Sequence, residues 1–191
     1  MESSVSFTSR IRPATLTEFT RLSEPLYNSA FVRHPWTAKE TIAAEKAFTM
    51  DVYDCTAGGI VDETGKKVVM FHICPEMSAN KCFGRVEQMI MEKLDDAHGK
   101  LRAFLTGSNK MFQDSKDLYE NLRQMLVKRN IPISELKGTG EKTHVLYDGV
   151  KDEWIVTNSA INDRVIRGEA SEKILGDCFD RVVVDSKDVI A

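Results

Sequence analysis

The sequence lacks the features that mark membrane, secreted and disulfide-built proteins. No apolar run approaches the roughly 20 residues that a membrane-spanning helix needs, so no membrane span is expected. The N-terminus has no positively charged segment followed by an apolar one, the pattern of a secretory signal. Only four cysteines occur in 191 residues, too few for a disulfide scaffold. Reduced thiols in a cytoplasmic protein are therefore expected.

Signals for nucleic acid, nucleotide and metal binding are also missing. The net charge is −3, and no stripe of alternating basic and aromatic residues is present, which disfavours nucleic acid as a partner. Gly138-Thr139-Gly140 is too short for a phosphate-binding loop. His72, Cys74 and Cys82 lack the paired CxxC or second histidine of common zinc sites. We expect neither a metal nor a cofactor.

What the sequence does contain is typical of one globular α/β domain. Apolar residues make up 42% and charged residues 29% of the chain, which are ordinary values. Apolar strand-like segments alternate with amphipathic helical ones, which predicts an α/β (α+β) fold with a layered mixed β-sheet flanked by helices. The expected helices cover 15–27, 83–97, a segment capped by Asp114 and running through Leu118 to Leu126, and 170–175; the expected strands cover 57–61, 66–74, 101–106, 143–147, 153–157 and 181–184.

The segment from Thr49 to Pro75 carries the main chemical prediction. Two apolar runs flank the polar turn Asp62-Glu63-Thr64-Gly65, which indicates a β-hairpin with a four-residue loop. If Val61 pairs with Lys66, an unbroken ladder places Cys55 directly opposite His72. The prediction depends on the loop length, and Gly58-Gly59 could carry a bulge that shifts the register.

A cysteine beside a histidine has two interpretations. The imidazole can accept the thiol proton and stabilise the thiolate, which makes Cys55 a nucleophile and His72 its base. Alternatively, Cys55 is an ordinary buried cysteine and His72 a hydrogen-bonded core residue, since both occur commonly in apolar strands. The spacing alone leaves both interpretations open.

The same segment resembles the CheD family of chemoreceptor glutamine deamidases. That family has a Thr six residues before a Cys and a His seventeen residues after it, as Thr49, Cys55 and His72 are spaced here. The resemblance extends over roughly residues 39–158. It is carried further by Phe104–Phe112, Leu118–Ile133, Gly138–Gly140, Val145–Asp148 and Trp154–Val156. The chain departs from the family in having Tyr53-Asp54 where Gly-Ser is usual, in retaining only Gly107 of a glycine pair, and in having Pro75 one residue closer to the histidine.

The resemblance implies a CheD-like fold and a cysteine-dependent protein-glutamine deamidase. Cys55 would be the nucleophile, His72 the base and acid, and Thr49 the residue that orients His72. On a straight strand six residues span about 20 Å, so Thr49 reaches the pair only if the chain bends sharply. Otherwise it is an ordinary strand threonine.

Three further residues are candidates for lining the pocket. Asp54 lies next to the nucleophile, and the turn residues Ser108 and Asn109 are expected near the strand ends. A plain turn without a role in the site is the alternative for Ser108 and Asn109, since both residue types are common turn formers.

The expected partner is a protein that presents a glutamine side chain. This chain is expected to act on it as a monomer. The resemblance suggests a chemoreceptor or another signalling protein. The unexplained N-terminal residues 1–38, outside the deamidase domain 39–191, also suit an effector secreted into a host cell. An amine in place of water would give transglutaminase side activity. A different class of function, a catalytically silent module that docks onto signalling proteins, stays open.

Overall fold

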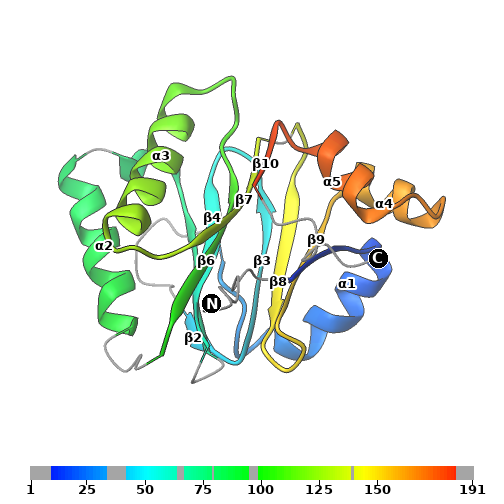
Figure 1. The fold of residues 1–191 in the computed structure, drawn as a ribbon, viewed down its shortest axis with the longest axis horizontal. Coiled ribbons are helices and arrows are strands. Elements are labelled where there is room, and N and C mark those ends of the chain that lie inside the picture. Colours follow the sequence, from blue (N-terminus) through cyan, green and yellow to red (C-terminus); the bar gives the residue numbers. More distant parts are fainter. Residues whose placement is uncertain are drawn as a thin grey trace, which may run out of the picture.

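The protein is built from two β-sheets packed face to face, with helices on the outside (Figure 1). The computed structural model describes residues 10–33, 42–63, 67–78, 80–94, 99–138 and 140–183. Each sheet mixes parallel and antiparallel neighbours. The predicted α/β class with a layered mixed sheet flanked by helices is therefore confirmed, with two sheets in place of one.

The larger sheet has six strands in the order β10-β7-β6-β4-β5-β2. Its strands are β2 (Ile42–Ala44), β4 (Thr56–Asp62), β5 (Lys67–Ile73), β6 (Leu101–Gly107), β7 (Ile133–Lys137) and β10 (Arg181–Val183). Among the described strands of this sheet, β6 and β7 are parallel neighbours and the other neighbours are antiparallel. Two helices, α2 (Asn80–Leu94) and α3 (Gln113–Lys128), cover its outer face (Figure 1). A short 3-10 helix, Pro75–Ser78, precedes α2.

The smaller sheet has four strands in the order β1-β9-β8-β3. Its strands are β1 (Arg10–Pro13), β3 (Lys46–Val52), β8 (Thr143–Asp148) and β9 (Glu153–Thr157). The closing hairpin expected at residues 143–157 is present as β8 and β9. The first strand, β1, lies parallel to β9, so the chain before residue 34 supplies one edge of this sheet. The domain boundary expected near residue 38 itself lies outside the described residues.

Strand alternation separates three apolar layers. In the smaller sheet Tyr147 and Trp154 face the larger sheet, whereas Phe48 and Leu146 face outward toward α1 (Leu16–Ser23). The amphipathic helix expected in 15–27 is present as α1 and the 3-10 helix Glu24–Leu26, and its Phe19 is buried. The layers are therefore helices, six strands, four strands and a helix. His72 and Thr49 are both buried between the two sheets.

The β4–β5 register differs from the predicted one by two residues. Val61 pairs with Val68 and Asp62 with Lys67, so the loop begins at Glu63 and not at Asp62. His72 consequently lies opposite Ala57, and the expected direct Cys55–His72 pairing is wrong. Because the shift is by an even number of residues, every side chain keeps its predicted face.

Asp114 does not cap α3 as expected. The helix begins one residue earlier, at Gln113, with Phe112 as its N-cap and no side-chain capping bond. Asp114 instead lies in the first turn, where a negative charge is favourable to the helix dipole. The predicted stripe Leu118, Leu122, Met125 and Leu126 is buried as expected.

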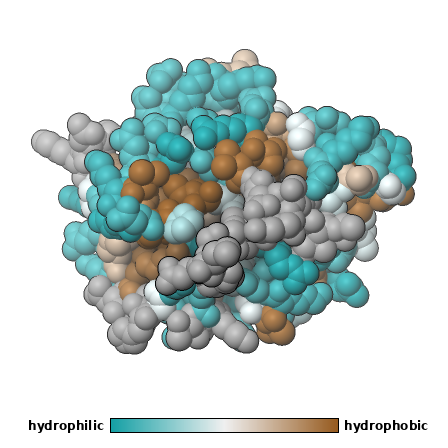
Figure 2. Space-filling model, viewed as in Figure 1, coloured by the Kyte–Doolittle hydropathy of each residue, from teal (hydrophilic) through white to brown (hydrophobic). Residues whose placement is uncertain are grey.

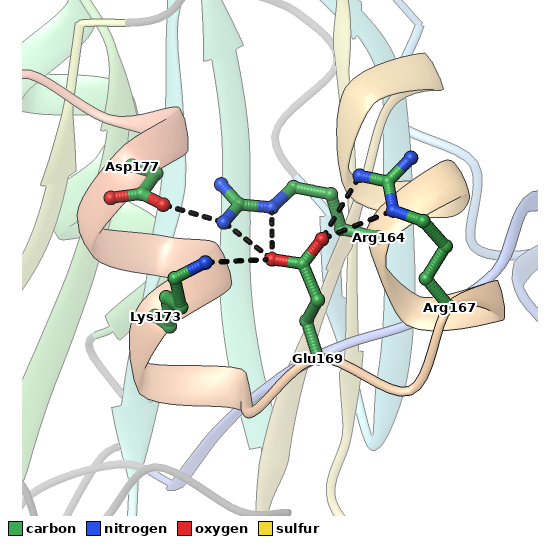
Figure 3. Close-up of polar contacts among 5 residues, drawn as sticks. All are labelled: Arg164, Arg167, Glu169, Lys173 and Asp177. Atoms are coloured by element: carbon green, nitrogen blue, oxygen red, sulfur yellow. Dashed lines mark hydrogen bonds and ion pairs between the residues drawn. The ribbon is translucent and has the colours of Figure 1, made fainter.

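Two C-terminal helices, α4 (Ser159–Ile166) and α5 (Ser171–Cys178), are joined by a network of charged side chains (Figure 3). Glu169, in the connection, accepts from Arg164 at 2.6 Å and from Arg167 at 2.9 Å. Arg164 also reaches Asp177 on α5. These guanidinium groups hold the pKa of Glu169 at about 2, well below its usual range.

Apolar and hydrophilic residues occupy different parts of the surface seen in Figure 2. Figure 2 shows apolar surface gathered near α2 and α3, while the α4–α5 end is mostly hydrophilic. Within the described residues, no helix combines the length and apolar character needed to cross a membrane.

Candidate functional site

Thr49 and His72 meet between the two sheets. Thr49 lies on β3 of the smaller sheet and His72 on β5 of the larger one, and both are completely buried. The Thr49 hydroxyl oxygen is 2.6 Å from His72 Nδ1. The sharp bend that the Thr49 assignment required is therefore present: the chain leaves β3, turns at Tyr53–Cys55 and enters β4 of the opposite sheet.

The hydrogen bonds of Thr49 determine which ring nitrogen of His72 carries the proton. The Thr49 hydroxyl also lies 2.7 Å from the carbonyl oxygen of Val32, which can only accept. Its single proton goes to Val32, so toward His72 the same oxygen accepts. His72 therefore donates from Nδ1, and in the neutral ring the lone pair is on Nε2.

Val32 is held in place by a short pairing with β3. Its backbone N–H donates to the Phe48 carbonyl at 2.9 Å, and the Phe48 N–H donates to the Ala30 carbonyl at 3.0 Å. A segment outside the CheD resemblance thus supplies the acceptor that fixes Thr49. Sequence reasoning missed this contribution because a backbone carbonyl leaves no residue-type signal.

Cys55 lies at the entrance of β4, beside the Thr49–His72 pair but not directly opposite His72. Continuing the β4–β5 register by one step from Thr56–Ile73 places Cys55 opposite Cys74. His72 is two residues along β5 from Cys74 on the same face, so it is the diagonal neighbour of Cys55. Diagonal neighbours lie about 7–8 Å apart at Cα, within reach of longer side chains.

The surroundings of Cys55 favour the protonated thiol. Its side chain is 1% exposed and its sulfur is 3.6 Å from Asp54 Oδ1. The pKa of Cys55 is raised above the ordinary thiol value by a hydrogen bond to Cys74, by burial, and by the nearby charges of Cys74 and Asp54. These surroundings thus disfavour ionisation of the Cys55 thiol without a base.

The loop after β6 packs against the backbone around Cys55. Ser108 N–H donates to the Cys55 carbonyl at 3.3 Å, and Asn109 N–H donates to Ser115 Oγ at 2.8 Å. Ser115, on α3, donates in turn to the Asp54 carbonyl at 2.5 Å. The structure therefore brings Asp54, Ser108 and Asn109 around Cys55. Ser115, which is completely buried, was missed because one serine at a helix start is an ordinary feature.

A cavity of about 470 Å³ lies beside the turn that leads to Cys55. Asp51, Tyr53, Lys142 and His144 are among its lining residues. Asp51 has a positive φ of 60° and donates its N–H to His144 Nδ1 at 3.1 Å. Burial lowers the pKa of His144, partly offset by the charge of Asp51. His144, on β8, lies away from the Thr49–His72 contact.

No family model matches the chain, and the search of curated proteins finds no relative. Among the described residues, no group of three or more histidine, cysteine, aspartate or glutamate side chains is arranged to hold a metal ion. The assignment of a function therefore rests on the geometry around Cys55.

Proposed function

We propose that this protein is a cysteine-dependent protein-glutamine deamidase in which Cys55, His72 and Thr49 form the catalytic group. The observation that carries the proposal is the buried contact of 2.6 Å between Thr49 and His72, made across two sheets by residues that the CheD resemblance pairs. A threonine bonded to Nδ1 presents the other ring nitrogen as the base, as nucleophile activation requires.

The reaction begins with proton transfer from Cys55 to His72 Nε2 and attack of the sulfur on the glutamine side-chain carbon. His72 then returns the proton to the leaving nitrogen, and ammonia departs from a thioester. Water attacks the thioester while His72 accepts its proton, which finally returns to Cys55. The products are glutamate and ammonia, and a primary amine in place of water would give transglutamination.

The oxyanion formed during attack needs a fixed donor, and we assign this role to the backbone N–H of Cys55. Ser115 holds the Asp54 carbonyl, and in a trans peptide the following N–H points the opposite way. The Cys55 N–H is therefore directed away from α3. Fixed backbone donors of this kind stabilise the tetrahedral intermediate without reorganisation.

The protein that presents the glutamine is proposed as a class only. A chemoreceptor or other signalling protein follows from the CheD resemblance, and a host protein met by a secreted effector is the other proposal. Both would have to bring a side-chain amide to Cys55, which is 1% exposed. The substrate backbone would therefore bind at the surface beside the β3–β4 turn, with the glutamine side chain reaching inward.

One observation favours the second candidate, a silent docking module. The buried Cys55 thiol, with its pKa raised by Cys74, by burial and by Asp54, is poorly disposed to ionise unaided. In that case the Thr49–His72 contact would only satisfy two buried polar groups. The two functions differ in whether glutamine side chains are hydrolysed.

The test is release of ammonia from casein, a glutamine-rich general substrate, followed by mass spectrometry of its peptides. We expect a gain of about one dalton at glutamines, the change produced by hydrolysis of an amide. Cys55→Ser should abolish this gain, and His72→Ala should reduce it by about 10²–10⁴-fold, the usual contribution of a general base. Cys82→Ser is the matched control and should leave it unchanged. Equal ammonia release by the wild type and Cys55→Ser would reject the proposal.

A further inference from the structure

Cys55 directly precedes β4 and Cys74 directly follows β5, so both cysteines lie at the open end of the β4–β5 hairpin. The observed ladder runs from Asp62–Lys67 to Thr56–Ile73, and continuing the same register by one residue places the two cysteines opposite each other. Directly opposed residues in an antiparallel pair have Cα atoms about 4.5–5.5 Å apart. Disulfides form across Cα distances of about 4.4–6.8 Å, so a bond between these sulfurs needs no change of register.

The two sulfurs also interact. The hydrogen bond between them raises the pKa of Cys55 and lowers the pKa of Cys74. Thiolate is the form that oxidants attack. Both side chains are nearly buried, at 1% and 4% exposed.

The other two cysteines have different surroundings. Cys82 lies on α2, and Cys178 ends α5, where burial raises its pKa. Both are half-buried. Of the four cysteines, the mechanism proposed above uses only Cys55, so Cys74 has no role in it.

We propose that Cys55 and Cys74 are a redox-modified dithiol that hydrogen peroxide converts to an intramolecular disulfide. The Cys74 thiolate attacks peroxide, breaks its O–O bond and becomes a sulfenic acid, releasing hydroxide, which takes up a proton to give water. The Cys55 sulfur then attacks the sulfenic sulfur and displaces a second water. Two thiols and one peroxide thus give one disulfide and two waters, and a reducing thiol reverses the bond.

The disulfide would also remove the proposed nucleophile. This consequence rests on the proposed function, because it matters only if Cys55 is catalytic. The disulfide itself depends only on the two sulfurs, so its detection does not require any substrate.

Trypsin separates the four cysteines, which makes the test direct. Cleavage after lysine and arginine leaves Cys55 in peptide 47–66, Cys74 in 68–81 and Cys82 in 82–85. The reduced full-length protein is treated with one equivalent of hydrogen peroxide, and remaining thiols are alkylated under denaturing conditions. Before alkylation we expect the intact protein to be about 2 Da lighter than the reduced protein, the two hydrogens of disulfide formation. After alkylation, trypsin should yield peptide 47–66 joined to 68–81.

Two variants test which cysteines form the disulfide. Cys82→Ser should form the same linked peptide at an unchanged rate, and Cys74→Ala should form none. Dithiothreitol should restore both thiols. The proposal is overturned if Cys55 and Cys74 both remain alkylatable after peroxide treatment, or if the linked peptides contain Cys82 or Cys178. A linked 47–66 and 68–81 pair in a protein without deamidase activity would support the dithiol and count against the proposed function separately.

Discussion

The hydroxyl of Thr49 has one proton but two hydrogen-bonding neighbours, the Val32 carbonyl and His72 Nδ1. Because it can donate to only one of them, it determines which ring nitrogen of His72 carries the proton. Since Val32 can only accept, His72 must donate from Nδ1. All three groups are buried, so no water competes for these bonds. A single threonine therefore orients the ring and selects its tautomer.

Replacing Thr49 should show how much the orientation of His72 contributes to the reaction, because Cys55 itself is unchanged. In Thr49→Val the shape is kept but His72 Nδ1 and the Val32 carbonyl lose their partner, which should cost about 1–3 kcal/mol of stability. We expect deamidation of casein to slow about tenfold, because one hydrogen bond of about 1.4 kcal/mol corresponds to a factor of ten. Thr49→Ser keeps the hydroxyl and should keep most of the activity. Equal rates for Thr49→Val and wild type would mean that Thr49 does not orient His72.

His144 should make the stability depend on pH. Burial lowers its pKa in the folded protein, so the unfolded chain binds a proton more readily. The stabilisation is present above the unfolded value of about 6.5 and is lost as the pH falls through the lower folded value. The melting temperature should therefore drop more between pH 7.5 and pH 5 in the wild type than in His144→Gln. Identical pH profiles would exclude His144 as a contributor.

At the scale of elements, the hairpin shows how far local sequence determines a site. The alternation of β5 correctly places His72 and Cys74 on one face, since a strand has period two. The loop length could not be fixed, because Asp62 is a typical turn residue, yet in the structure it pairs with Lys67. That two-residue difference brings Cys74, and not His72, opposite Cys55.

Gly107 should be required for the position of Cys55. It has a φ of +111°, and a Cβ there would overlap the carbonyl oxygen of Cys55. We expect Gly107→Ala to lower the stability by several kcal/mol, because backbone on both sides must move, and to reduce casein deamidation. Gly176→Ala is the control, since a Cβ at that helical position meets nothing within 4 Å. Equal melting temperatures for these two variants would contradict the assignment.

The α4–α5 network in Figure 3 should stabilise the C-terminal helices in a salt-dependent way. Because Glu169 has its pKa lowered to about 2, its stabilisation is complete above the unfolded value near 4.3 and is lost as the pH falls toward 2. Glu169→Gln should lower the melting temperature slightly at pH 7, and 1 M NaCl should shrink the difference by screening. A difference that does not respond to salt would point to packing instead of charge.

At the scale of the whole molecule, the site exists because two sheets face each other. Most helices and strands follow from periodicity, and the closing hairpin was predicted almost to the residue. What the sequence could not show is that β3 and β4 belong to different sheets, or that residues 30–32 pair with Phe48, since long-range pairing leaves no local pattern. The edge strand β1 and helix α4 were missed for the same reason: they are short and depend on tertiary packing.

The central claim is that His72 activates Cys55, and the alkylation rate of Cys55 tests it most directly. The label on peptide 47–66 is followed with iodoacetamide at pH 7 in a Cys74→Ala background, so that no second thiol competes. The account predicts that Cys55 reacts faster than Cys82 and Cys178, and that His72→Ala slows this reaction at least tenfold while the fold, checked by circular dichroism, persists. A Cys55 rate unchanged by His72→Ala would contradict the account and leave the docking module as the better interpretation.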